Sequence, residues 1–349
     1  MLPDPGGRPV GFYVHHHGSG HATRCKQLAA ALPTGAPYRF FGSDATHFPT
    51  PWRQHFTLLP PDVDTSTGPH RRDPSTDLLA DEVLHYAPTD MPGLSQRMAT
   101  IAEWIAEEQP AYFVVDLSVE IALFVRLCGC PVHLVRLHGR RTDLAHTAAF
   151  GLANSTLAPF APCMEDAHTP AWLRQKTRYL GTFSRYDDRN EPRPQVRSTL
   201  GYGPDRPLVT VVNGSGGDDR DATYWGEVAR RHPDHDWLLV GKLRDEEEPP
   251  SNLRITGYVA DTYPYLRAAD YIIGSGGTNT MSEVAAVRGR FISLPEPRPF
   301  EEQHCKMQAL ANLGLTVMLT ERPEPQDWTS ILARADELDL DGWRQLYTS

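Results

Sequence analysis

Short apolar runs of strand length alternate along this chain with segments in which apolar residues recur at helical spacing. Such alternation is typical of parallel βαβ units, because two parallel strands must be joined by a long crossover that is usually a helix. In the first half the pattern predicts strands at residues 10–15, 38–41, 56–59, 112–115 and 132–137, and helices at 22–32, 94–108 and 119–127.

The same alternation restarts after residue 207 and predicts a second domain of the same kind. The chain then ends in a predicted helix, 328–349, that could cross back to the first domain. The fold class is therefore α/β, with two Rossmann-like, doubly wound domains. In the second half strands are predicted at 208–212, 237–240, 253–256, 271–273 and 291–294, and helices at 222–231, 263–269 and 279–287.

Length supports the division into two domains, because 349 residues exceed what one hydrophobic core usually supports. We expect an N-terminal domain over 1–184, a charged, proline-containing linker over 185–196 and a C-terminal domain over 197–327. Residues 60–92 are rich in Pro, Asp, Thr and His. This segment is too polar to pack and predicts a long loop over a site.

Composition excludes several classes of function. The longest apolar run, 111–130, is interrupted by Asp116, Glu120 and Arg126, so no span of a bilayer is predicted. The first residues lack the pattern of a signal peptide, and the five scattered cysteines fit reduced thiols, which together predict a cytoplasmic protein. A net charge of −10 argues against a nucleic-acid partner, since clustered Lys and Arg bind phosphate backbones.

The first glycine-rich turn, Gly18-Ser19-Gly20-His21, lies between the first predicted strand and the first predicted helix. Glycines let the backbone approach a ligand closely, and the free N–H groups of a helix start attract negative charge. His21 is placed on the first helical turn, where a base can face a cleft. The alternative is a glycine turn without a ligand. The run His15–His17 predicts no metal site, because adjacent side chains on a strand point to opposite faces.

A second glycine-rich turn, Asn213-Gly214-Ser215-Gly216-Gly217, follows the first predicted strand of the second half. Its backbone amides could hold a diphosphate without a lysine. The turn lacks the Gly-Lys-Ser/Thr ending of a P-loop and the full spacing of a dinucleotide fingerprint, so neither ATP nor NAD is predicted.

The third stretch joins a predicted strand, the turn Gly276-Gly277-Thr278 and a helix that carries Glu283. This order supplies amides for phosphate and, on the same side, a carboxylate that can accept hydrogen bonds from ribose hydroxyls. The alternative for Glu283 is a solvated charge on the surface of the helix.

At these residues the chain resembles the family 28 glycosyltransferases, which have the GT-B fold and include the N-acetylglucosaminyltransferase of lipid II synthesis. The resemblance is specific over residues 257–314 and implies two domains that face a cleft. It implies donor contacts from Tyr258 and Val259 at the base, Gly276, Gly277 and Thr278 at the phosphates, Glu283 at the ribose, and Glu302 and Gln303 at the sugar, with Asn213, Gly214, Ser215 and Gly216 as a second phosphate loop and Gly18, Ser19, Gly20 and Arg24 on the acceptor side.

The resemblance implies a metal-independent, inverting transfer of a hexose or N-acetylhexosamine from a UDP-sugar to a hydroxyl acceptor, with no cofactor. His21 is the candidate base, and Asp116 could orient its imidazole. The alternative for Asp116 is a helix N-cap, and the alternative for Arg24 is a surface charge. The acceptor is left open among lipid-linked compounds, saccharides and natural products, as is a peripheral contact with the inner face of the membrane. The family's Asp-Gln-x-x-Asn-Ala reads Glu302-Gln303-His304-Cys305-Lys306-Met307 here, which leaves the donor sugar open.

Three other functions fit the same fold. Gly18-Ser19-Gly20-His21-Ala22-Thr23-Arg24-Cys25 also resembles the Gly-x-Gly-His-x-x-Arg-Cys of the UDP-sugar hydrolases of pseudaminic acid synthesis, which direct water at the sugar. A 2-epimerase is less favoured, because its paired catalytic carboxylates are not evident. A sugar-nucleotide-binding subunit without turnover is the remaining alternative.

Overall fold

The computed structural model describes residues 2–16, 19–62, 84–88, 90–213, 222–241 and 248–347. Most of the predicted loop at 60–92 lies outside the described residues. So do the predicted site residues Gly18, Gly214, Ser215 and Gly216.

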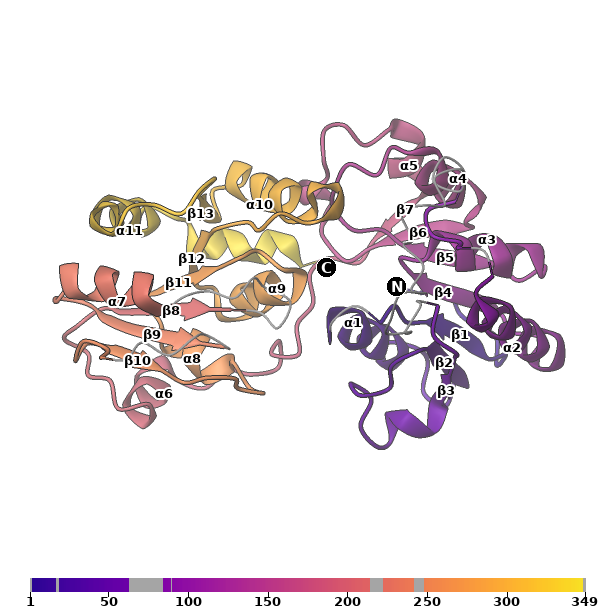
Figure 1. Cartoon of the computed structure of the whole chain (residues 1–349), viewed down its shortest axis with the longest axis horizontal. Helices are drawn as coiled ribbons and strands as arrows, with labels where there is room; N and C mark the ends of the chain where they lie inside the picture. The colour runs from indigo at the N-terminus through magenta and orange to yellow at the C-terminus, as the bar shows by residue number, and fades with distance from the viewer. Residues whose placement is uncertain are drawn as a thin grey trace. The chain divides into compact units, whose positions relative to one another are not determined.

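By their mutual contacts the residues group into two units (Figure 1), of which the first comprises 1–137, 141–158 and 168–179. Among its described residues, seven parallel strands form one sheet in the order β3-β2-β1-β4-β5-β6-β7. The strands are β1 (Val10–Tyr13), β2 (Tyr38–Gly42), β3 (Phe56–Leu58), β4 (Tyr112–Asp116), β5 (Val132–Val135), β6 (Ser155–Ala158) and β7 (Thr177–Tyr179), and the helices are α1 (Ser19–Ala30), η1 (Trp52–His55), α2 (Pro92–Glu108), α3 (Val119–Leu127), α4 (Leu144–Leu152) and α5 (Ala171–Lys176).

The second unit comprises 138–140, 159–167 and 180–349. Its described residues include six parallel strands in the order β10-β9-β8-β11-β12-β13. The strands are β8 (Leu208–Val212), β9 (Asp236–Val240), β10 (Leu253–Ile255), β11 (Tyr271–Gly274), β12 (Arg290–Ser293) and β13 (Thr316–Met318), and the helices are η3 (Pro162–Met164), α6 (Arg193–Thr199), α7 (Ala222–Arg231), α8 (Tyr263–Ala268), α9 (Thr278–Val287), η4 (Pro299–Glu301), α10 (Glu302–Asn312), η5 (Pro325–Asp327), α11 (Trp328–Asp336) and η6 (Leu340–Leu346).

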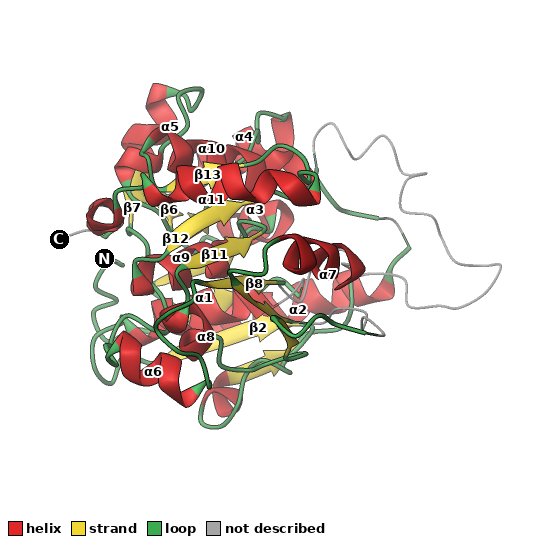
Figure 2. Ribbon diagram, turned by 90° about the vertical axis from the view of Figure 1, so that its left-hand side faces the viewer, coloured by secondary structure: helices red, strands yellow, loops and turns green. Residues whose placement is uncertain are grey.

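Helices surround the strands of both sheets (Figure 2), and the alternation of buried side chains explains why. On β8, Val209 and Val211 pack with residues of α7 and α11, whereas Leu208 belongs to a separate cluster with residues of α6 and α8. Successive side chains of a strand point to opposite faces, so a strand that is apolar throughout must be covered on both. The first unit follows the same rule, with Phe113 and Val115 in a cluster shared with α2, α3 and α4.

The predicted α/β fold with two doubly wound sheets is confirmed, and several element boundaries differ. The strand predicted at 10–15 ends at Tyr13, so His15 and His16 leave it, and their rings stack at 4.8 Å between centroids. The reason given against a metal there, opposite faces of a strand, is therefore wrong. The final predicted helix is two elements, α11 and the 3-10 helix η6. The domain boundaries stay a prediction.

The sequence predicts no span of a bilayer. None of the helices within the described part of the chain combines the length and the apolar character needed to cross a bilayer.

The cluster of Trp225, Trp237 and Trp328 is the largest aromatic contact of the second core, with ring centroids 5.3–6.1 Å apart. We expect Trp328→Ala to lower the free energy of unfolding by about 3–5 kcal/mol, because it leaves a large cavity. Urea denaturation followed by circular dichroism measures the change. Trp172→Ala, at a side chain that is 42% exposed, is the matched control, and equal midpoints for the two variants would contradict this account of the core.

Candidate active site

Both sheets reverse their strand order between two central strands, β1 and β4 in the first unit and β8 and β11 in the second. In open α/β sheets, ligands bind outside the carboxyl ends of the strands at such a switch point. Tyr13 pairs with Val115, and Val212 with Gly274, so the carboxyl ends of each pair lie side by side. Several predicted site residues, among them His21, Asp116, Asn213 and Gly276, fall at these two positions.

At the switch point of the first unit, three side chains meet. Asp116 is the last residue of β4 and is fully buried, and His21 and Arg24 lie on the first turns of α1. The two guanidinium nitrogens Nε and Nη2 of Arg24 donate to the carboxylate of Asp116 at 3.1 and 3.0 Å. His21 Nδ1 lies 3.2 Å from Asp116 Oδ2.

The charge of Asp116 is balanced inside the protein. Burial alone would raise the pKa of Asp116, but the Arg24 guanidinium and His21 outweigh burial and hold that pKa well below its usual range. Cys25 Sγ also lies 3.7 Å from Asp116 Oδ2, and burial raises the pKa of this thiol, which stays protonated. Asp116 is therefore an ionised acceptor surrounded by donors.

The tautomer of His21 decides whether this histidine, beside Asp116, can act as a base. Nδ1 lies within reach of both Asp116 and Arg24 Nη2, the latter at 3.1 Å. Arginine can only donate and an ionised carboxylate can only accept, so a bare Nδ1 accepts from Arg24, whereas a hydrogen on Nδ1 satisfies Asp116. The tautomer with the hydrogen on Nδ1 leaves Nε2 with its lone pair, which is the state of a general base. Because Arg24 already balances the charge of Asp116, the carboxylate is free to orient the ring in that tautomer.

Two alternatives raised by the sequence are wrong. The N-cap of α3 is Ser118, whose side chain accepts from Ile121 N at 3.3 Å, so Asp116 does not cap this helix. Leu117 between them has a positive φ of 71°, an uncommon conformation that bends the chain away from Asp116. Arg24 is buried, so its alternative as a surface charge is excluded.

In the second unit the turn Gly276-Gly277-Thr278 leads from β11 into α9. Gly276 has a φ of +84°, and a Cβ there would lie 2.5 Å from Met307 Cγ, so only glycine fits between the turn and α10. Gly277 is the N-cap of α9 and, as a glycine, has no side chain that could accept from the first N–H groups of the helix. The helix therefore presents its first N–H groups without a side-chain cap, as an anion site requires.

Beside this turn, Asn213 follows β8. Its side-chain nitrogen and oxygen are both buried and have no hydrogen-bond partner among the described residues. A buried amide without a partner costs about 1–3 kcal/mol. Asn213 therefore places a buried amide that can pair with a ligand at the carboxyl end of β8.

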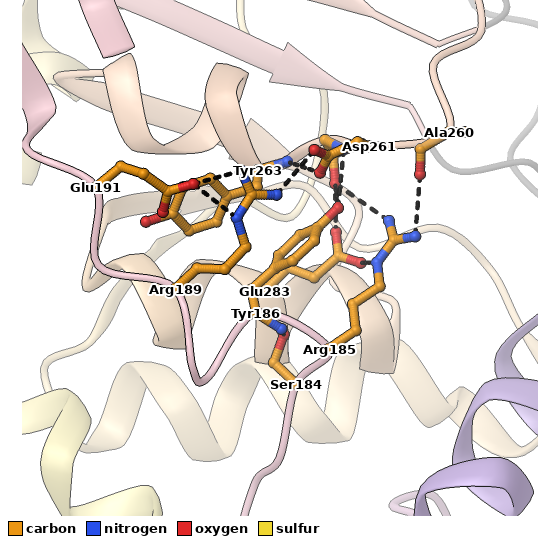
Figure 3. A network of polar contacts seen from close by, with 10 residues as sticks. Ser184, Arg185, Tyr186, Arg189, Glu191, Ala260, Asp261, Tyr263 and Glu283 are labelled. Carbon is orange, nitrogen blue, oxygen red and sulfur yellow. Dashed lines mark hydrogen bonds and ion pairs between the residues drawn. The ribbon is translucent and has the colours of Figure 1, made fainter. Parts of the chain in front are cut away.

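Glu283 lies on α9 and is 8% exposed, so its alternative as a solvated helix charge is wrong. Arg185 Nε donates to Oε1 at 3.0 Å (Figure 3). Thr262 Oγ1 donates to Oε2 at 2.8 Å. Burial raises the pKa of Glu283, and the charge of Arg185 and both hydrogen bonds oppose the rise. The carboxylate is thus fixed in direction by two donors.

The segment predicted as a linker is part of this site, which the sequence reasoning missed. Arg185 Nη1 donates to Ala260 O at 3.0 Å, and Arg189 Nη1 pairs with Asp261 at 2.8 Å (Figure 3). Tyr186 OH accepts from Thr262 N at 2.8 Å, and the Arg185 guanidinium lies over the Tyr186 ring at 4.7 Å. The signal in the sequence was the density of arginines around one tyrosine, which a solvated linker does not need.

The remaining predicted donor residues have mixed surroundings. Tyr258 is 68% exposed and Val259 packs partly on a core cluster. Gln303 is buried, and its Oε1 accepts from Glu296 N at 2.9 Å, so one side of its amide is engaged by the protein. Glu302 Oε1 lies 3.4 Å from Lys306 Nζ. The turn before α10 holds Phe300 and Glu301 at positive φ, which is strained for these residues.

Within the described residues, no group of three or more His, Cys, Asp or Glu side chains is arranged to hold a metal ion.

Comparison with known proteins gives low-identity relatives. No family model matches the chain. It is 27% identical over 187 residues to the UDP-N-acetylglucosamine–N-acetylmuramyl-(pentapeptide) pyrophosphoryl-undecaprenol N-acetylglucosamine transferase of Streptococcus pneumoniae (strain Hungary19A-6), over 51% of this chain and 49% of that protein. An uncharacterized glycosyltransferase of Methanosarcina acetivorans is 25% identical over 246 residues, 66% of this chain and 60% of that one. The chain thus spans about half the length of the first relative.

Solved structures share the fold across nearly the whole chain. The glycotransferase of kitacinnamycin matches with a TM-score of 0.66 and 12% identity, covering 99% of this chain and 94% of that one. MurG of Acinetobacter baumannii matches with a TM-score of 0.61 and 15% identity, covering 97% and 94%. The chain has the GT-B fold and is related, at low identity and over half its length, to the N-acetylglucosamine transferase of S. pneumoniae.

The buried pair of Asp116 and Arg24 gives a pH-dependent prediction. The pKa of Asp116 is lower in the folded chain than in the unfolded one, so its ionised form stabilises the fold above about pH 4, and this contribution is lost as pH falls toward the folded pKa. Asp116→Asn leaves Arg24 buried without its counterion. We expect it to lower the free energy of unfolding at pH 7 by about 3–5 kcal/mol.

Urea denaturation between pH 7 and pH 2 measures this difference, which should narrow below about pH 4. Asp205→Asn, at an exposed aspartate, is the control. A difference that stays constant down to pH 2 would show that the stabilisation does not come from the ionised carboxyl.

Proposed function

We propose that this protein is a glycosyltransferase that moves a hexose or N-acetylhexosamine from a UDP-sugar to a hydroxyl acceptor, with inversion at the anomeric carbon. One observation carries the proposal. The uncapped start of α9 follows a glycine turn at the switch point of the second sheet, and the same helix carries the buried, oriented carboxylate of Glu283. A nucleotide diphosphate is a ligand that uses both features, the helix start for its phosphates and the carboxylate for its ribose.

On the donor side, the first N–H groups of α9 are proposed to bind the diphosphate. The carboxylate of Glu283 accepts from the ribose hydroxyls, for which its ionised form is required. Thr262 already donates its hydroxyl hydrogen to Glu283, so Tyr186 OH, 3.0 Å away, is the donor to Thr262 Oγ1. Burial raises the pKa of Tyr186 to about 12, which keeps this hydrogen in place at neutral pH. The chain Tyr186, Thr262, Glu283 therefore fixes the carboxylate before a ligand arrives.

On the acceptor side, His21 is the proposed base. Its Nε2 takes the proton of the acceptor hydroxyl while Asp116 holds Nδ1–H. The acceptor oxygen attacks the anomeric carbon from the face opposite the leaving UDP, so one displacement inverts the configuration.

The names of relatives support a sugar nucleotide as substrate. The S. pneumoniae relative is named for transfer from UDP-N-acetylglucosamine. We propose the same donor or a close analogue here. The acceptor named for that relative is not carried over, because this chain spans only about half of it. From the likeness to the same relative we also propose that the protein is cytoplasmic and makes a peripheral contact with the membrane.

A UDP-sugar hydrolase is the second candidate, and one observation favours it. Arg24 and Cys25 complete the Gly-x-Gly-His-x-x-Arg-Cys resemblance, and both contact Asp116, the carboxylate that orients His21. The motif therefore forms one group around the proposed base. In a hydrolase the same His21 Nε2 would deprotonate water.

Donor binding is tested by Glu283→Gln, which keeps the shape of the side chain and removes its charge. A hydrogen bond to a charged group contributes about 1.5–3 kcal/mol, so UDP affinity should fall about 10- to 100-fold. Calorimetry measures the UDP affinity of both proteins. Glu227→Gln, at a half-exposed glutamate paired with Arg231 on α7, is the matched control. No association of UDP with the unaltered protein, or equal affinity in the Glu283 variant, would contradict the donor site.

Turnover is tested by His21→Ala, with UDP release as the readout. The rate should fall about 10²- to 10⁴-fold, as for loss of a general base, while UDP affinity stays unchanged. His47→Ala, at an exposed histidine, is the control. The substrates are a panel of UDP- and dTDP-sugars with and without hydroxyl acceptors. Release that requires an acceptor supports transfer, release in water alone supports the hydrolase, and full activity in the His21 variant would exclude this base.

A further inference from the structure

Lys306 stands where the related family carries an asparagine, and lysine is rare here, with four in the whole chain. The residue lies on α10, one position before Met307, whose side chain packs against Gly276. Its place on the helix is therefore fixed against the turn that precedes α9.

The ammonium group reaches that turn directly. Lys306 is 1% exposed, and its Nζ donates to Thr278 Oγ1 at 2.7 Å and to Gly276 O at 3.5 Å. Glu302 Oε1 lies 3.4 Å away on the same helix and is partly exposed. A positive charge is thus buried at the two residues that open and close the Gly276–Thr278 turn.

This position is electrostatically unfavourable without an anion. The N-terminus of a helix carries a partial positive charge, so a cation is destabilising there and an anion is stabilising. Burial adds the cost of removing the ammonium from water, which protein partners such as the Glu302 carboxylate at 3.4 Å offset. A doubly charged ligand at the start of α9 would remove both penalties.

A second observation points to a ligand at the same edge. The amide of Asn213, which is buried and has no partner in the described part of the chain, follows β8, and the turn follows β11, the strand paired with β8. Lys306 also prepares Thr278. Because Thr278 Oγ1 accepts from Nζ, its own hydrogen is directed elsewhere and can be donated to an oxygen anion.

We propose that Lys306 binds the diphosphate of the sugar nucleotide and stabilises it as the leaving group, in place of a metal ion. The inference rests on the proposed function and adds a residue to it. In the transfer, the bond between the anomeric carbon and the β-phosphate oxygen breaks, and its electron pair stays on that oxygen. The acceptor oxygen forms the new bond, and its proton goes to His21 Nε2. The negative charge gained by the diphosphate is met by the Lys306 ammonium and the Thr278 hydroxyl.

The competing interpretation is structural, with Lys306 only fastening α10 to the turn. The two interpretations differ in which ligands bind more weakly after substitution of Lys306. A structural fastener would support uridine and UDP alike, because loss of the turn disturbs the whole site. A phosphate-binding ammonium affects UDP and leaves uridine unchanged, since uridine has no phosphate.

The experiment compares UDP and uridine on the full chain. Lys306→Met removes the charge with similar length, and Lys306→Asn restores the residue of the related family as a second variant. UDP affinity is measured by calorimetry and uridine affinity by displacement of UDP. We expect both variants to bind UDP about 10- to 100-fold more weakly and uridine as before. Lys176→Met, at a lysine of the first unit that donates to Gly151 O, is the matched control and should change neither affinity.

An equal loss of UDP and uridine affinity, or no loss of either, would overturn the role of Lys306 while leaving the donor site itself intact. Melting temperatures of the variants show whether each is folded. Failure of the unaltered protein to bind UDP would overturn the proposed function, and the inference with it.

Discussion

The carboxyl ends of parallel strands meet at one edge of a sheet, and this constraint decides where the chemistry of both units lies. Where the strand order reverses, between β1 and β4 and between β8 and β11, the two crossovers leave in opposite directions and open a space that side chains can enter. Asp116 and Asn213 are the residues at which β4 ends and β8 has just ended, and α1 and α9 begin beside them. A helix start supplies donors at the same edge, so anionic ligands and oriented bases are both favoured there.

At this edge of each sheet, the described residues include a buried carboxylate that pairs with an arginine. Asp116 with Arg24 is fully buried and held by two hydrogen bonds, whereas Glu283 with Arg185 has one such bond and a half-exposed arginine. The difference matches the tasks proposed for them. An orienting carboxylate need never leave its counterion, because only the imidazole acts. A carboxylate that must accept from a ligand needs a partner that can move, and the exposed guanidinium of Arg185 can do so at lower cost.

The sequence predicts the fold well because strands that are apolar throughout give a strong signal on both faces. Predicted and observed elements agree at α3, α7 and β8 to the residue. The short edge strands β7 and β13 and the strand β6 were missed, since three or four residues such as Thr177–Tyr179 carry no periodicity. Glu283 could be found from its place after a glycine turn. For Arg185 the density of arginines around Tyr186 was a signal, but its partner Glu283 lies 98 positions away and could not be read from it. The contact of Lys306 with Thr278 spans 28 positions, and no local pattern encodes it.

A net charge of −10 repels an anionic ligand such as a sugar nucleotide, so the cations proposed to meet it must lie close to it. The described site supplies them in two ways. Arg185 keeps its charge near water, where it is screened and can exchange partners, and Lys306 keeps its charge buried beside the start of α9. A buried charge acts at full strength over a short distance, and, on the proposal that it meets a diphosphate, its burial is costlier without that ligand than with it. Part of the affinity proposed for the diphosphate would then come from relief of a cost already present in the folded chain, rather than from new contacts alone.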